Sequence, residues 1–250
     1  MKNKLTKSIF TIFLVLITVF GISACSKSNQ PTEENNTVSS NQNNTVTDEY
    51  KQPELVDSGY TIIQDENYCL IYYSVEIKNP NSEYAIEFPT ITLTSKAENG
   101  TIIDTQEQVI HSIAASDTFK YATKTQYEGK KASTVDISVS SGVESYNYII
   151  QDDAVYPQTK DFVVNNISNT TNNSIFGDEH IFTGEIINSS KNNYSMLLVC
   201  VNLYKDGKLV GGNSTFIDNV TANQTKAFKI EGIPTNIEFD NYEINACPWA

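Results

Sequence analysis

The chain has 250 residues and a formal net charge of −13, from 30 acidic residues against 17 lysines and no arginine. Nucleic acids and anionic lipid surfaces are bound through clustered cations, and arginine is the usual residue for bidentate phosphate contacts. The composition therefore excludes both as electrostatic partners. Solubility is the simpler interpretation of the acidity, and an acidic binding face is the alternative.

The first 25 residues have the pattern of an export signal. Three lysines lie among the first seven residues, an apolar run follows over residues 9–20, and Ile22-Ser23-Ala24-Cys25 places small residues before a cysteine. The run is shorter than the about 20 apolar residues that cross a bilayer. This segment resembles the signal and lipobox of a bacterial lipoprotein. An ordinary thiol in a secretory signal is the alternative.

The resemblance implies a membrane anchor. Residues 1–24 would be removed, the Cys25 sulfur would carry a two-chain, palmitate-type lipid, and two chains are enough for lasting attachment. The protein would then stay on the outer face of the cytoplasmic membrane of a Gram-positive cell. Without the three signal lysines the formal charge would be 14 − 30 = −16.

Residues 26–50 consist mainly of Asn, Ser, Thr, Gln and Glu, with Val38 and Val46 as the only aliphatic residues. Such a segment buries too little apolar surface to offset its ordering entropy. We expect residues 25–54 to form a disordered, lipidated tether.

An internal repeat divides the remainder of the chain into two copies. The matched pairs keep their order at an offset of 107 to 110 residues: Glu76-Ile77-Lys78-Asn79 with Glu185-Ile186-Ile187-Asn188, Tyr84 with Tyr194, Leu93 with Leu203, and Ala115 with Ala222. A fixed period of this length indicates a duplicated module of about a hundred residues.

Each copy is predicted to be all β, because its segments are short, rich in Tyr, Ile, Val, Thr and Phe, and separated by turn residues. The predicted strands are residues 68–78, 83–95, 101–110 and 118–125, then 180–188, 194–204, 208–217, 224–230 and 236–245. Asp206-Gly207 is a hairpin dipeptide. We therefore predict two tandem immunoglobulin-like β-sandwiches at residues 55–155 and 162–250, joined by a linker at 154–161.

The second copy resembles an FxLYD-type domain. The resemblance lies in Val201-Asn202-Leu203-Tyr204-Lys205-Asp206-Gly207, in Gly184 to Asn188 before it, and in the turn from Val220 to Thr225 after it. Val201 replaces the Phe of the motif and Lys205 is inserted. The resemblance implies an immunoglobulin-like fold, occurrence in bacterial surface lipoproteins and no enzymatic chemistry.

Three cysteines remain beyond Cys25. Cys200 and Cys247 fall in the second copy, so a disulfide between them is one outcome in an oxidising compartment and free thiols are the other. Cys69 would be a buried thiol. None of the three has metal-ligand or C-x-x-C spacing.

No catalytic or cofactor pattern emerges. His111 and His180 lie in different copies without a nucleophile signature, and Gly211-Gly212 is an isolated pair that indicates a bulge. The acidic stretches at 65–67 and 178–179 lack the calcium-loop pattern and read as polar turns. Six tyrosines crowd the first copy and are expected as half-buried strand residues, with an exposed ligand-stacking face as the alternative: Tyr72, Tyr73, Tyr121, Tyr127, Tyr146 and Tyr148. Trp249 is expected to pin the C-terminus to the last sheet.

The sequence therefore predicts a non-enzymatic, lipid-anchored protein whose modules act as interaction or spacer domains in the cell envelope, with an envelope protein or glycan as partner and no cofactor, metal or nucleic acid. A solute- or glycan-binding lipoprotein serving a transporter or the cell wall is the alternative, although such proteins usually bind in a cleft between lobes. A cell-wall hydrolase is a third class, for which no carboxylate pair can be located.

Overall fold

The computed structural model describes residues 50–65, 67–142, 145–174 and 177–249. Cys25 and most of the expected tether lie outside these residues. The described part is built from antiparallel strands with two short 3-10 turns, and residues 47–250 form one compact unit. No helix among the described residues is long and apolar enough to span a bilayer.

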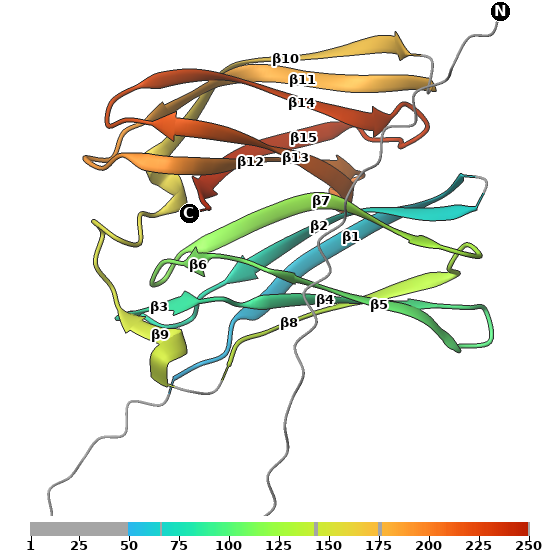
Figure 1. Ribbon diagram of the computed structural model, residues 1–250, viewed down its shortest axis with the longest axis horizontal. Coiled ribbons are helices and arrows are strands. Elements are labelled where there is room, and N and C mark those ends of the chain that lie inside the picture. Colours follow the sequence, from blue (N-terminus) through green and yellow to red (C-terminus); the bar gives the residue numbers. More distant parts are fainter. Residues whose placement is uncertain (1–49, 66, 143–144, 175–176, 250) are drawn as a thin grey trace, which may run out of the picture. The chain divides into compact units, whose positions relative to one another are not determined.

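The first sandwich has sheet β1-β2-β7 on one side (Figure 1). Its other side consists of sheet β5-β4-β8 and the short sheet β6-β3-β9. The strand bounds are β1 Glu54–Asp65, β2 Tyr68–Lys78, β3 Tyr84–Glu87, β4 Thr90–Lys96, β5 Ile102–Val109, β6 Ser112–Ile113, β7 Thr118–Glu128, β8 Thr134–Ser140 and β9 Tyr148–Ile150.

The second sandwich packs sheet β10-β11-β14 on sheet β13-β12-β15. The strand bounds are β10 Phe162–Ser174, β11 Gly177–Asn188, β12 Tyr194–Lys205, β13 Lys208–Val220, β14 Thr225–Pro234 and β15 Asn241–Pro248. The prediction of an all-β fold with sandwich modules is confirmed.

The strands predicted from alternating or continuous apolar residues are present, with two kinds of difference. The strand expected at 83–95 is two strands, β3 and β4, because Phe88 adopts φ 55° and Pro89 follows it. β1, β8 and β10 were not predicted, because polar residues interrupt each of them. The predicted Asp206-Gly207 hairpin is confirmed, with φ values of 51° and 74° that suit the left-handed turn between β12 and β13.

The repeat has a structural counterpart in two buried asparagines at equivalent strand ends. Asn79 donates from Nδ2 to the carbonyl oxygens of Ile113 (3.0 Å) and Ala114 (3.1 Å). Asn188 donates from Nδ2 to the carbonyl oxygen of Thr221 (3.1 Å), the residue equivalent to Ala114. Both asparagines are 0 % exposed. Each copy thus uses its asparagine to tie the end of one strand to the turn that precedes β7 or β14.

Those turns also match. Ser116 and Asn223, at equivalent places, both adopt left-handed backbone conformations, with φ values of 58° and 59°. The turn hydrogen bonds from Asp117 N to Ala114 O (3.2 Å) and from Gln224 N to Thr221 O (3.1 Å) are equivalent as well. The matched backbone geometry supports a duplication, since local propensity alone favours glycine at such positions.

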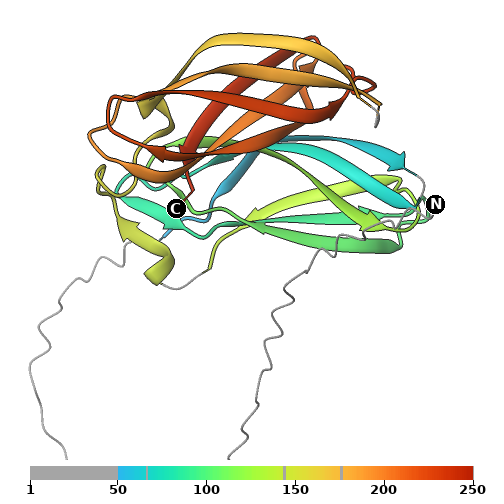
Figure 2. The same cartoon turned by 45° about the horizontal axis from the view of Figure 1, so that its top comes forward.

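The two sandwiches share a core. Sheet β1-β2-β7 of the first contacts β12 and β13 of the second (Figure 2). Because β2 and β12 lie in these two central sheets, both faces of each strand are covered over most of its length. Along β12, Leu197, Val199, Val201 and Leu203 point into the second sandwich, whereas Leu198 and Cys200 join the core of the first. The two modules are therefore fused through what would otherwise be their outer faces.

The boundary expected between the modules is also different. Tyr156, placed in the linker, is buried against Ala85 and Ala114 and donates its hydroxyl hydrogen bond to Glu87. The first sandwich therefore extends to residue 156. A short 3-10 turn, Thr159–Asp161, leads into β10, and Thr159 N donates to Asp117 Oδ2 at 2.7 Å.

Candidate functional site

The sandwiches meet at what we call the central interface, the surface buried between sheet β1-β2-β7 and sheet β13-β12-β15. Thr61 Oγ1 donates to Val210 O at 2.7 Å, and the buried Ser74 Oγ donates to Gly211 O at 2.8 Å. Gly59 lies opposite Ser74 in the β1-β2 ladder, and its missing side chain lets the Leu209 backbone approach closely. The interface therefore depends on small residues and on side chains that satisfy backbone carbonyls.

Lys120 of β7 is the charged centre of the interface. Its ammonium donates to Tyr204 Oη at 3.1 Å and pairs with Glu243, both from the second sandwich, and it lies 3.5 Å from Glu76. Asn245 Nδ2 donates to the Lys120 carbonyl oxygen at 2.7 Å. Burial alone would lower the pKa of Lys120, but its hydrogen bonds to Glu243 and Tyr204 raise the pKa above the ordinary value. Lys120 is thus held charged at neutral pH.

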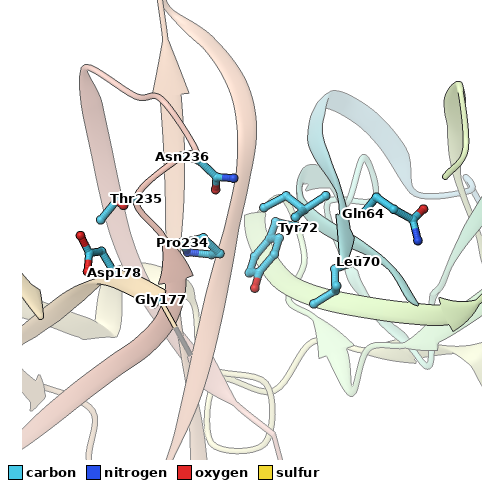
Figure 3. A pocket seen from close by; sticks show the side chains of 9 residues that line it. Gln64, Leu70, Tyr72, Gly177, Asp178, Pro234, Thr235 and Asn236 are labelled. Atoms are coloured by element: carbon cyan, nitrogen blue, oxygen red, sulfur yellow. The ribbon is translucent and has the colours of Figure 1, made fainter. Parts of the chain in front are cut away.

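A cleft of about 510 Å³, which we call the end cleft, opens at one end of the central interface. Figure 3 shows side chains from both sandwiches around it. Its lining consists of Ile63, Gln64, Leu70 and Tyr72 from the first sandwich and Gly177, Asp178, Pro234, Thr235 and Asn236 from the second.

The polar groups of the end cleft are suited to hydrogen bonding. Burial, with a smaller contribution from the Glu179 carboxylate, raises the pKa of Tyr72 to about 12, so its phenol stays protonated. Asp178 Oδ1 accepts a hydrogen bond from Asn173 at 2.7 Å. Cys, His and Lys are absent from the described lining residues. The cleft can recognise a small polar molecule by shape and hydrogen bonds.

Cys200 and Cys247 are both buried in the central interface and both are free thiols, so the disulfide considered from the sequence is not formed. In the β12-β15 ladder Cys200 lies opposite Asn245, whereas Cys247 lies opposite Leu198. The two sulfurs are therefore on diagonal positions. Burial raises the pKa of Cys200 to about 12 and that of Cys247 well above its usual range. Cys69 is a buried free thiol in the first core, as expected.

The two histidines lie in different local environments. His111 lies in the loop after β5, with its ring 6.1 Å from that of Phe88. His180 lies in β11 and packs in an aromatic cluster, 4.9 Å from the Phe239 ring, and burial lowers its pKa. Of the residues that the structure describes, no three His, Cys, Asp or Glu side chains form a group that could hold a metal ion.

Five of the six tyrosines noted in the first copy are core residues and do not form an exposed stacking face. Tyr72, Tyr73, Tyr121, Tyr127 and Tyr148 are buried, and Tyr146 alone among the six is exposed. The Trp249 backbone N–H donates to Met196 O in the last sheet, as predicted, but its ring stacks on Tyr121 of the first sandwich at 6.1 Å. The C-terminus thus joins both sandwiches.

Sequence reasoning missed Gly59 and Lys120. No local pattern marks them, because their roles depend on a sheet more than 80 residues away along the chain. Asn79 and Asn188 were visible as repeated residues, but their burial was not.

Comparisons with known proteins add little. No protein-family model matches the sequence, and no curated protein matches it. Among solved structures, a transglutaminase from red sea bream is 10 % identical with a TM-score of 0.22, and the alignment covers 77 % of this chain and 29 % of that one. The N-terminal CBM22-1-CBM22-2 tandem domain from Paenibacillus barcinonensis Xyn10C is 9 % identical with a TM-score of 0.15, covering 79 % and 86 %. These likenesses are too weak to assign a function.

Proposed function

We propose that this chain is a non-enzymatic lipoprotein, anchored through Cys25 to the outer face of the cytoplasmic membrane, whose fused sandwiches act as an interaction or spacer body in the cell envelope. The anchor rests on the sequence pattern before Cys25. We further propose that the second sandwich is an FxLYD-type domain. Val201 and Leu203 as core residues and the left-handed hairpin after Lys205 agree with that resemblance.

The observation that most favours a spacer or interaction role is the central interface. Two sandwiches joined by a flexible linker would move independently, whereas a shared core holding Leu198, Cys200 and Cys247 makes them move together. A rigid body at the end of a flexible tether presents one fixed surface within the reach of the tether from the membrane.

The test is metabolic labelling of cells with a fatty-acid analogue. The wild-type chain should be labelled and should sediment with membranes, and Cys25→Ser should abolish both, because no other residue is placed to receive the lipid. Cys69→Ser is the matched control and should keep the label. An unlabelled wild-type chain would refute the anchor.

The end cleft favours a second candidate, a solute- or glycan-binding lipoprotein. Its mixture of apolar and hydrogen-bonding residues is typical of small-molecule sites. Calorimetry of the full chain against cell-wall oligosaccharides should give saturable heat that Tyr72→Phe and Asn236→Ala both weaken, while Asn99→Ala, on a distant loop, leaves it unchanged. Absence of saturable heat would remove this candidate.

A further inference from the structure

Strand β10 is an outermost strand of its sheet (Figure 1). It pairs with β11 on one edge, and no strand among the described residues pairs with the other. Residues 165–173 are exposed at every position, so neither side of this stretch is covered by packing. Every second residue of such a strand directs its N–H and C=O groups to the open edge. The edge is thus accessible to another strand.

The composition of β10 is unusual for an open edge. Natural edge strands are commonly protected by charges, especially lysine, which block pairing with another chain. Among the described strands longer than four residues, β10 alone contains no Asp, Glu or Lys. It also contains no proline. On a chain with a net charge of −13, this edge is a neutral stretch where a like-charged molecule meets little repulsion.

The nearest carboxylates belong to β11 and are engaged by β10 amides. Asn166 Nδ2 donates to Glu185 Oε2 and Asn173 Nδ2 donates to Asp178 Oδ1, both at 2.7 Å. Neighbouring strands lie about 4.8 Å apart, so the β11 strands of two molecules paired through β10 would be about 14 Å apart. This separation exceeds the Debye length of about 8 Å at physiological ionic strength. Repulsion between the acidic strands is therefore screened.

We propose that the open edge of β10 pairs antiparallel with β10 of a second copy of this chain, giving a two-fold dimer with one continuous sheet. Because outward backbone groups alternate, a two-fold pairing must place residues of the same parity opposite each other. In the register centred on Thr171, Thr171 faces its own copy and Asn169 faces Asn173 of the other molecule. Thr pairs across strands are favourable, and no like charges meet.

A second copy is the occupant that the chain itself supplies. In each copy, residues 165–173 of β10 are exposed and carry no charged side chain. The interface is isologous, so it closes at two copies and does not grow into fibres. The pairing does not depend on the lipid anchor.

The test compares the self-association of full chains in detergent by sedimentation equilibrium. Thr171→Lys and Thr171→Glu each place like charges directly opposite, and each should weaken dimerisation by about tenfold or more. A mixture of the two variants should restore association, because opposite charges then meet. Thr105→Lys, an exposed threonine on the outermost strand β5, is the matched control and should dimerise as the wild type does.

Amide hydrogen exchange tests whether the dimer contact lies at the open edge of β10. The amides within residues 168–174 that point to the open edge should become protected as the wild-type concentration rises, and should stay unprotected in Thr171→Lys. A chain that is monomeric at every concentration overturns the proposal. A dimer that survives both Thr171 variants, or one that leaves these amides unprotected, overturns it as well, because the contact would then lie elsewhere.

Discussion

Replacing Gly59 by Ala tests the central interface directly. A Cβ built on Gly59 would overlap the Leu209 carbonyl group and lie 2.8 Å from Leu209 Cβ, where ordinary contact begins at 3.4 Å. A backbone carbonyl in a paired strand cannot rotate away, so the two sheets must separate. A separation of roughly 1 Å loses about half of the dispersion energy between the facing atoms.

The expected decrease in the free energy of unfolding follows from the neighbours of Gly59. Overpacking costs about 1–3 kcal/mol, and the hydrogen bonds from Thr61 to Val210 and from Ser74 to Gly211, about 1 kcal/mol each, would be stretched. Because the Gly59 backbone does not need a positive φ, alanine gains back about 0.4–1 kcal/mol from the unfolded chain. We expect a net loss of about 3 kcal/mol.

Thermal unfolding of the full chain, followed by far-ultraviolet circular dichroism, measures the effect. For a unit of this size, the loss corresponds to a fall in Tm of about 6–12 °C. The fused core should also make the wild-type transition single, and the variant should broaden or split it. Ser58→Ala, at the exposed neighbouring position, should leave the Tm unchanged. A Gly59→Ala protein at or above the wild-type Tm would show that the sheets do not touch here.

Three further outcomes are expected. Lys120→Met should lower the free energy of unfolding by about 1–2 kcal/mol in urea titrations near neutral pH, because Glu243 and Tyr204 lose their partner. Since the pKa of Lys120 is raised, this stabilisation is complete below about pH 10 and disappears only as the pH rises through the folded-state pKa; equal stability of the variant would contradict it. Asn79→Ala and Asn188→Ala should each lower the free energy of unfolding by about 2–4 kcal/mol, because buried carbonyl oxygens lose their hydrogen-bond donors. A large decrease in only one of the two variants would argue against equivalent roles. Buried Cys200 and Cys247, with raised pKa values, should resist maleimide in the native protein and react after denaturation; fast native labelling would refute their burial.

The two copies differ on the sheet face that forms the central interface in the first of them. On the central face of sheet β1-β2-β7 stand Leu70 and Ala122; the equivalent positions on sheet β10-β11-β14 carry Glu179 and Lys229. Lys229 there pairs with Glu231. Charged residues on this face resist burial. The face of sheet β10-β11-β14 therefore lacks the apolar character of the equivalent face that packs in the central interface.

The class of fold, the repeat and most strands of the two copies follow from local and periodic patterns in the sequence. Alternation along residues 197–203, the turn at Asp206-Gly207 and the paired asparagines are local or periodic signals, set by the period of a pleated strand and by turn stereochemistry. The continuous apolar character of β2 and β12 was visible too, but it does not say what covers the second face.

The sequence patterns do not show that the second face of β12 meets the first sandwich. Gly59, Lys120 and Trp249 act across separations that leave no periodic trace in the sequence, and the polar composition of β10 conceals that strand. Burial between two sheets depends on which surfaces meet, and that choice is made by packing the whole chain rather than by any segment of it.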